Sequence, residues 1–211
     1  MSARKSPKHI AIAGNIGAGK TTLTAKLAKH YGWSAHYEDV EHNPYLADFY
    51  QDMPRWSFNL QIYFLNSRLQ QLIDIQQGSQ SVIQDRTIYE DAYIFAPNLH
   101  DMGLMTGRDF ENYTSFFTTL KKMVSPPDLL IYLKASIPKL VEQIQARGRE
   151  YEENIRLDYL KRLNGFYNSW IESYTDGPLL VIDVEKLNIP GNEEDFADVV
   201  RRIDAQLFGL F

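Results

Sequence analysis

The sequence predicts an α/β protein in which five parallel strands carry helices on both faces of the sheet. Short runs rich in valine, isoleucine and leucine alternate with longer segments of helical period, which is typical of a buried parallel sheet. The first run ends at a glycine-rich loop that opens a helix, and the second and third runs end in acidic residues. Ligands of such sheets bind at the carboxyl ends of the strands, so we expect the loop and the acids at one edge.

The predicted elements follow one another along the chain. The first strand, residues 9–14, is an apolar run that ends in glycine, and the helix after it keeps Leu23, Leu27 and Tyr31 on one spacing and ends at Gly32. The remaining strands are expected at residues 34–40, 81–85, 128–135 and 178–183. The remaining helices are expected at residues 44–50, 56–77, 90–99, 110–124, 138–149, 157–174 and 192–207.

Composition limits the classes of function. The chain has 211 residues and no marked shift of composition, so we expect residues 1–211 to form a single domain. The net charge is -5, and an acidic chain binds nucleic acid poorly because the phosphate backbone requires a basic face. The absence of cysteine excludes disulfides and thiol catalysis and fits a cytoplasmic protein. No apolar run approaches the roughly 20 residues of a membrane span.

The segment GNIGAGKT, residues 14–21, matches the phosphate-binding pattern G-x-x-x-x-G-K-[ST]. It follows a predicted strand and opens a predicted helix, as the mechanism requires. Glycines let successive N–H groups turn toward phosphate oxygens, Lys20 would reach the β- and γ-phosphates, and Thr21 would bind Mg²⁺. A nucleoside triphosphate is the expected ligand. The residues expected to hold it are Gly14, Asn15, Ile16, Gly17, Ala18, Gly19, Lys20, Thr21 and Thr22.

The rest of the chain indicates what the triphosphate is used for. A guanine-reading Asn-Lys-x-Asp segment is absent from the sequence, which disfavours a GTPase switch and leaves a small-molecule kinase. A phosphate acceptor would need an arginine clamp, whereas a hydroxyl acceptor is helped by a carboxylate base. Glu38 stands at the end of the second predicted strand, at the ligand edge, and would repel an anionic acceptor. A hydroxyl acceptor is therefore favoured.

Four segments carry a resemblance that runs almost the whole chain: YEDVEHNPYLADFY, PRWSFNLQIYFLNSRLQ, QDRTIYEDAYIFA and QARGREYEE. In this order and spacing they resemble the deoxyribonucleoside kinase family, and the first segment is similar to the bacterial purine-type members, the deoxyadenosine kinases. The resemblance implies a P-loop kinase fold with a helical lid at about residues 143–157. It also implies ATP and Mg²⁺ as cofactors, phosphorylation of the deoxynucleoside 5′-hydroxyl, purine preference with deoxyadenosine first, and a homodimer.

The resemblance further implies a role for each matching residue. Glu38 would take the proton of the 5′-hydroxyl, Arg86 would hold Glu38 and the 5′-oxygen, and Asp85 would join Thr21 in binding Mg²⁺. The residues implied to bind the deoxynucleoside are Glu38, Tyr50, Trp56, Gln61, Phe64, Arg68, Arg86, Asp91, Phe95 and Glu152. Arg147 and Arg149 would form the lid over the transferring phosphoryl group, and Asp195 and Phe196 in NEEDFAD would contact the adenine of ATP.

One departure from the family and several alternatives remain. Many relatives carry a further arginine one helical turn before the lid, where this chain has Gln143. A glutamine amide can pair with an adenine edge or with cytosine, so Gln61 leaves a pyrimidine-preferring or broad-specificity enzyme open. A thymidylate-like nucleoside monophosphate kinase shares the glycine loop and can share the Asp-Arg pair. A nucleotide-binding switch or assembly subunit is the alternative that involves no metabolic reaction.

Overall fold

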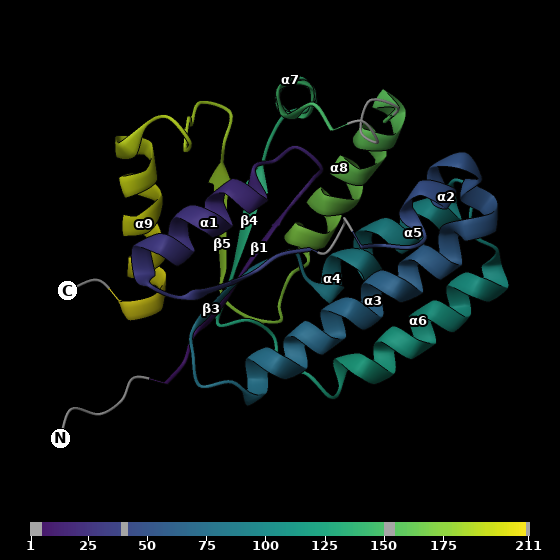
Figure 1. The fold of residues 1–211 in the computed structure, drawn as a ribbon, viewed down its shortest axis with the longest axis horizontal. Helices are drawn as coiled ribbons and strands as arrows, with labels where there is room; N and C mark the ends of the chain where they lie inside the picture. The colour runs from purple at the N-terminus through teal and green to yellow at the C-terminus, as the bar shows by residue number, and fades with distance from the viewer. Residues whose placement is uncertain (1–5, 39–41, 150–154, 210–211) are drawn as a thin grey trace.

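The computed structural model describes residues 6–38, 42–149 and 155–209, and its centre is a five-stranded sheet (Figure 1). The strands lie in the order β2-β3-β1-β4-β5, and every neighbouring pair is parallel. Their bounds are β1 His9–Gly14, β2 Ser34–His36, β3 Val82–Asp85, β4 Leu129–Lys134 and β5 Leu179–Asp183. The predicted α/β class and the five-stranded parallel sheet are confirmed.

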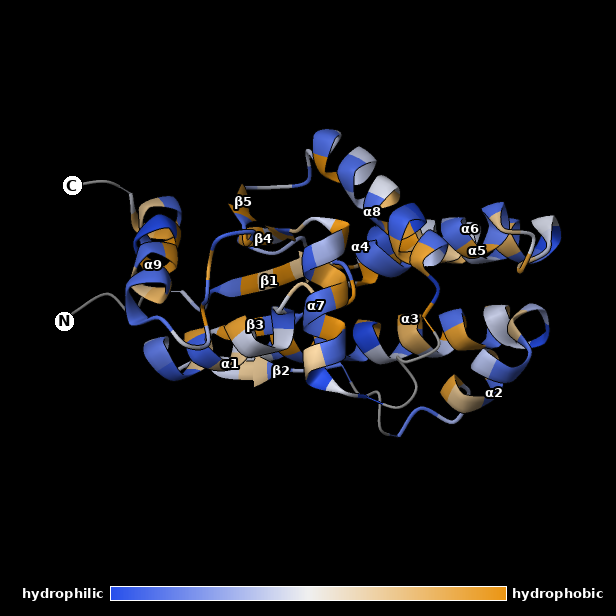
Figure 2. Ribbon diagram, turned by 90° about the horizontal axis from the view of Figure 1, so that it is seen from above, coloured by the Kyte–Doolittle hydropathy of each residue, from blue (hydrophilic) through white to orange (hydrophobic). Residues whose placement is uncertain are grey.

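Helices cover both faces of this sheet (Figures 1 and 2). Helices α1 and α9 pack on one face, and α3, α4, α5, α6 and α8 pack on the other. The bounds are α1 Lys20–Tyr31, α2 Leu46–Gln51, α3 Met53–Gln77, α4 Ile88–Glu90, the π-helical turn η1 Asp91–Phe95, α5 Ala96–Asp101, α6 Gly107–Lys121, α7 Ile137–Arg147, α8 Leu157–Glu172 and α9 Glu193–Phe208. Within the described ranges, no helix has the length and apolarity needed to cross a membrane.

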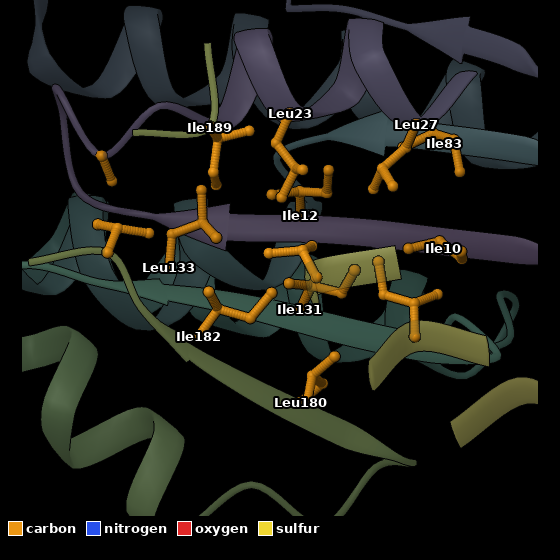
Figure 3. Packing of buried hydrophobic residues seen from close by; sticks show 14 of the residues in the cluster. Ile10, Ile12, Leu23, Leu27, Ile83, Ile131, Leu133, Leu180, Ile182 and Ile189 are labelled. Atoms are coloured by element: carbon orange, nitrogen blue, oxygen red, sulfur yellow. The ribbon is translucent and has the colours of Figure 1, made fainter. Parts of the chain in front are cut away.

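Alternating residues of β1 separate the two halves of the core. Ile10 and Ile12 point to the face covered by α1 and α9, where they meet Leu23 and Leu27 (Figure 3). The alanines between and after them face the larger helical layer. Both sets are fully buried, and burial of each isoleucine or leucine side chain contributes roughly 1.5–3 kcal/mol. The central strand is thus fixed from both sides, and its carboxyl end has one well-defined position.

Two helices, α3 and α6, begin three residues earlier than the periodicity predicts, because their caps lie before the apolar pattern. Helix α3 starts at Met53 and not at residue 56: the Asp52 carboxylate accepts the Arg55 N–H at 3.2 Å. Helix α6 starts at Gly107 because the Thr106 hydroxyl accepts the Asp109 N–H at 3.2 Å. An acid or hydroxyl at this position satisfies an N–H that has no partner within the helix.

The segment predicted as one helix at residues 90–99 contains a π-helical turn. The Ala96 N–H donates to the Asp91 carbonyl, five residues back. Pro97 follows directly and has no N–H to donate to the carbonyl four residues before it, which favours a local change of pitch. Asp91 and Phe95, at the two ends of the turn, both line the same cavity. The π turn therefore shapes one wall of the candidate site.

The first residue of β1, His9, is a buried histidine whose ring pairs with a neutral amide. Its Nε2 lies 2.9 Å from Gln84 Oε1 on β3, and its backbone N–H donates to Asp128 at 2.8 Å. Burial lowers the pKa of His9 from 6.5 to about 4, and the Gln84 contact and the Asp128 charge offset this only in part. His9 is thus neutral in the folded protein at pH 6, where the unfolded chain would bind a proton.

His9 predicts a specific acid sensitivity. Its folded pKa lies below its unfolded pKa, so its contribution to stability is complete above about pH 6.5 and is lost as pH falls toward 4. Compared with His9→Gln, which cannot titrate, the wild type should lose about 2 kcal/mol more unfolding free energy between pH 7 and pH 5. Urea unfolding of both proteins at the two pH values measures this. Parallel losses would contradict the assignment.

Candidate active site

The sheet register brings the glycine loop and the Asp-Arg pair side by side. Ile12 of β1 pairs with Asp85 of β3, and the Arg86 N–H donates to the Ile12 carbonyl at 3.0 Å. The glycine loop leaves β1 two residues later. Glu38 follows β2, the neighbouring edge strand, which ends at His36. Strand β2 was predicted to run to residue 40, but the chain leaves the sheet after His36, and residues 39–41 lie outside the described part.

The loop after β1 has the conformation of a phosphate cradle. Gly17 and Gly19 adopt φ values of +84° and +91°, a region that favours glycine. A Cβ on Gly17 would lie 2.7 Å from the Leu140 carbonyl of α7. Lys20 Nζ donates to the Gly14 and Asn15 carbonyls at 2.8 and 3.1 Å, inside the curl of the loop. Burial, followed by repulsion from Arg86, lowers the pKa of Lys20 to about 8.

Thr21 and Asp85 form the second feature of the loop. The Thr21 hydroxyl donates to Asp85 Oδ2 at 2.5 Å. The other carboxylate oxygen, Oδ1, is buried and has no hydrogen-bond partner among the described residues. A buried carboxylate oxygen without a donor is costly, and a cation or a bound ligand would relieve it.

Glu38, which is partly buried, lies in a chain of charges with buried arginine and aspartate side chains. Its Oε1 is 2.6 Å from Arg68 Nη2 of α3, and its Oε2 is 3.5 Å from Arg86 Nε. Arg68 Nη1 lies 3.0 Å from Asp91 Oδ2 of η1. Burial raises the pKa of Glu38, but the charges of Arg68, Arg86 and Lys20 outweigh it and hold that pKa at about 2. The cations around Glu38 therefore hold it in its charged form.

Asp91 differs from Glu38 although both face Arg68. Burial raises the pKa of Asp91 to about 7, because the attraction of Arg68 is partly offset by repulsion from Glu38. The 3.0 Å approach to Arg68 also lacks hydrogen-bond alignment, since Asp91 Oδ2 has no hydrogen-bond partner within the described chain. Arg68 thus contacts two carboxylates, and its hydrogen-bond alignment is better with Glu38 than with Asp91.

Most residues predicted to bind the nucleoside line one cavity. The predicted nucleoside-binding residues that line this cavity are Glu38, Tyr50, Gln61, Phe64, Arg86, Asp91 and Phe95. Residues predicted to bind ATP or the metal ion line the same cavity: Ile16, Gly17, Lys20, Thr21, Asp85, Arg147 and Arg149. Arg68 lies behind this wall, with its guanidinium 5.0 Å from the Phe64 ring. Trp56 does not line the cavity and packs against Tyr45 and Arg55. Glu152 and part of the predicted lid lie outside the described residues. We call this cavity the acceptor cavity.

A second cavity lies on the other side of the loop. It is lined by residues 17–22 of the loop, by Lys139, Glu142, Gln143, Ala146, Arg147 and Arg149 around α7, and by residues 184–190 after β5. We call it the donor cavity. Gly17, Lys20, Thr21, Arg147 and Arg149 line both cavities. The two cavities therefore meet over the loop and beneath the end of α7.

Asp195 and Phe196, predicted to contact adenine, are not among the residues that line the donor cavity. Phe196 is buried in the core, where its ring lies 5.8 Å from that of His30. Asp195 accepts the Asn188 N–H at 2.7 Å and so holds the segment that does line the cavity. Gln143 does line it: its Oε1 lies 3.6 Å from the position of a Cβ on Gly19. Their roles toward a nucleotide stay predictions.

The sequence reasoning missed Glu90, a fully buried carboxylate beneath the site. It accepts the Gly14 N–H at 3.3 Å, the Thr87 N–H at 2.9 Å and the Tyr167 hydroxyl at 2.7 Å. These donors belong to the glycine loop, the turn after β3 and helix α8. An acid in the first turn of a helix is ordinarily a capping residue, so the sequence carried no signal of this wider role.

Other missed residues complete the acceptor cavity. They are Leu46, Phe49, Leu60, Ile155 and Tyr159. Tyr159 lies in the first turn of α8, near Arg86, and burial raises the pKa of its hydroxyl to about 12. Apolar residues of this kind look like ordinary core in a sequence, and periodicity cannot tell a cavity wall from a packed interior.

The fold and the site define a P-loop kinase: a parallel sheet, a phosphate-binding loop after its first strand, and two cavities that meet over that loop. The family model for deoxynucleoside kinase matches residues 10–208 of the chain. The chain therefore belongs to the deoxynucleoside kinase family, as the sequence motifs predicted.

Curated relatives and solved structures agree with this assignment. A deoxyadenosine/deoxycytidine kinase of Bacillus subtilis is 38% identical over 209 residues, which cover 96% of this chain and 95% of that protein. A deoxyguanosine kinase of Lactobacillus johnsonii is 37% identical and covers 94% of this chain and 92% of its own. Deoxyadenosine kinase from M. mycoides, with the products dCMP and a flexible dCDP bound, has a TM-score of 0.84 at 30% identity, over 93% of this chain and 99% of its own.

The crowding around Gly17 predicts the effect of adding one methyl group. Gly17→Ala combines a positive φ with a Cβ 2.7 Å from a backbone oxygen, whereas Gly32→Ala has a similar φ, +67°, and open space. We expect about 1 kcal/mol of destabilisation for Gly32→Ala and roughly 2–4 kcal/mol for Gly17→Ala. Chemical unfolding of both variants measures the difference. Equal losses would show that α7 does not press on the loop.

Proposed function

We propose that this protein transfers the γ-phosphoryl group of ATP to the 5′-hydroxyl of deoxyribonucleosides, with purines preferred and deoxyadenosine first. The observation that carries the proposal is the meeting of the two cavities over the glycine loop. One cavity has aromatic and amide side chains suited to a nucleoside, and the other opens on the loop N–H groups suited to a triphosphate. Five residues common to both cavities mark where the phosphoryl group would pass.

Each charged residue would then have a part in the transfer. The O–H bond of the 5′-hydroxyl breaks as its proton moves to Glu38, and the oxygen forms the new bond to phosphorus while the bond to the ADP oxygen breaks. Arg86 lies beside Glu38 and would orient the same oxygen. Lys20, Arg147 and Arg149 line both cavities and would neutralise the charge on the transferring group.

A divalent cation fits the Thr21–Asp85 pair. A hydroxyl oxygen and a carboxylate oxygen 2.5 Å apart, with a second carboxylate oxygen unsatisfied, are hard oxygen ligands of the kind that Mg²⁺ prefers. No group of three or more possible metal-ligating side chains occurs in the described ranges, which suits an ion held mainly by substrate phosphates and water. Mg²⁺ bound there would supply positive charge to the β- and γ-phosphates.

The base preference rests on Gln61 and on the relatives. Gln61 is buried at the cavity wall, and its Oε1 has no partner among the residues described. This acceptor can receive the exocyclic amino group of adenine or cytosine, while Phe64 and Phe95 supply the walls against which the base packs. Relatives named as deoxyadenosine kinases support adenine first, and the Bacillus subtilis relative, named for both deoxyadenosine and deoxycytidine, keeps cytosine as the second candidate.

Three finer points belong to the same proposal. The lid is proposed at about residues 143–157, since Arg147 and Arg149 at its start already line both cavities. A homodimer is proposed, supported by the exposure of Phe116 on α6 and of Met123 just after that helix, which are 46% and 73% exposed. A cytoplasmic location is proposed from the cysteine-free sequence.

The experiment that tests the function is a labelled-ATP transfer assay with the four deoxynucleosides and their 5′-monophosphates. We expect deoxyadenosine to be phosphorylated with the highest kcat/KM. Glu38→Gln should lower kcat by roughly 10²–10⁴-fold with a small change in KM, because the amide cannot take the 5′-hydroxyl proton.

The matched control is Glu111→Gln, an exposed carboxylate on α6 that should leave kcat unchanged. Phosphorylation of monophosphates alone would favour a thymidylate-like kinase. ATP hydrolysis without any acceptor would favour a nucleotide switch. Either result would overturn the proposal.

A further inference from the structure

The arrangement around Arg68 raises a question of how Glu38 can act as a base. Arg68 Nη2 is 2.6 Å from Glu38 Oε1, closer than Arg86 Nε, which is 3.5 Å from Oε2. A carboxylate held this tightly by a buried guanidinium has little tendency to accept a proton. Burial alone would raise the pKa of Glu38, but the positive charges around it, Arg68 foremost, lower that pKa to about 2. In this arrangement the candidate base lies in an unreactive pairing.

We propose that Arg68 is a positioning residue that restrains Glu38 until a nucleoside binds, and that the bound nucleobase draws the guanidinium away and releases the carboxylate to the 5′-hydroxyl. The inference rests on the proposed function, because it assigns Glu38 to the proton transfer. Arg68 does not line the acceptor cavity itself, whereas both of its carboxylate partners do. It would act through Glu38 and not on the sugar or the phosphates.

The guanidinium has unused capacity for a new partner. Its Nε is buried and makes no hydrogen bond within the described residues, and its contact with Asp91 is close but poorly aligned. Gln61 and Asp91 line the cavity from α3 and η1, so a base lying between them would present its edge next to Arg68. A ring nitrogen or carbonyl oxygen of the base is the acceptor chemistry that would complete the guanidinium.

The exchange conserves the pairing of buried charges. Before binding, Arg68 serves Glu38 and Asp91; afterwards it would keep Asp91 and gain the base, while Glu38 keeps Arg86 and gains the 5′-hydroxyl. No ion is left alone, which matters because an unpaired buried charge costs several kcal/mol. Phe64 lies under the guanidinium, with 5.0 Å between Cζ and the ring centroid, and would support a sliding movement in the ring plane.

The test compares an acceptor that has a nucleobase with one that lacks it, in the wild type and in a variant without the Arg68 guanidinium. The acceptors are deoxyadenosine and the abasic sugar 1,2-dideoxyribose, which keeps the 5′-hydroxyl. In the wild type the abasic sugar should be a very poor acceptor. Arg68→Met should lower kcat/KM for deoxyadenosine about tenfold or more, yet raise kcat/KM for the abasic sugar about fivefold or more above wild type. A gain of activity cannot come from damaged folding or from lost base contacts.

A second measurement supplies the base separately. Free adenine should stimulate phosphorylation of the abasic sugar by the wild type and should have no such effect on Arg68→Met. If the single variant is unstable, Arg68→Met/Asp91→Asn removes opposite charges together and is compared in the same way. The control is Arg201→Met on the exposed face of α9, which should behave as wild type with both acceptors.

The outcomes separate this inference from the function on which it rests. If deoxyadenosine is phosphorylated but Arg68→Met and the double variant show no gain with the abasic sugar, Arg68 serves only to bind the base and the inference is overturned. If the wild type phosphorylates no deoxynucleoside, the proposed function itself has failed.

Discussion

The candidate site depends on one buried carboxylate, Glu90. A glutamate with no exposed surface must be satisfied by donors or positive charges, and here three donors converge on it: Gly14, Thr87 and the Tyr167 hydroxyl. They come from three segments that are far apart in the sequence. Because each unmade hydrogen bond to a buried carboxylate would cost more than an ordinary one, the glycine loop, the turn after β3 and α8 are held in one arrangement.

Asn15 makes a second, independent link between the same elements. Its Nδ2 donates to the Leu160 carbonyl and to Asn164 Oδ1, each at 3.1 Å, and its Oδ1 accepts the Ile16 N–H at 2.8 Å. The loop is thus tied to α8, the helix that follows the predicted lid segment. The position of the phosphate-binding loop is therefore coupled to that of α8.

The parts of this structure that the sequence could predict are those set by local chemistry. The glycine loop, β1, α1 and its end at Gly32 follow from residue type and spacing, and the structure has them as expected. What escaped prediction depends on tertiary packing. In the sequence, Glu90 looks like an ordinary capping acid and Tyr159 looks like an ordinary core residue. The segment of the π turn before Pro97 looks like part of an unbroken helix. Asp195 and Phe196 match a family motif, yet the ring of Phe196 is buried in the core. The spacing of the motif alone cannot show this.

Arg86 shows how strain and function meet at the strand end. Among the described residues it is the non-glycine residue with a positive φ, +71°, a conformation that costs roughly 1–3 kcal/mol. The strain is held by its N–H bond to Ile12 and by the stacking of its guanidinium 4.5 Å over the Phe95 ring. The turn sends consecutive side chains in different directions: Asp85 toward Thr21 and Arg86 toward Glu38. The end of β3 thus contributes one side chain to the Thr21 side of the site and the next to the Glu38 side.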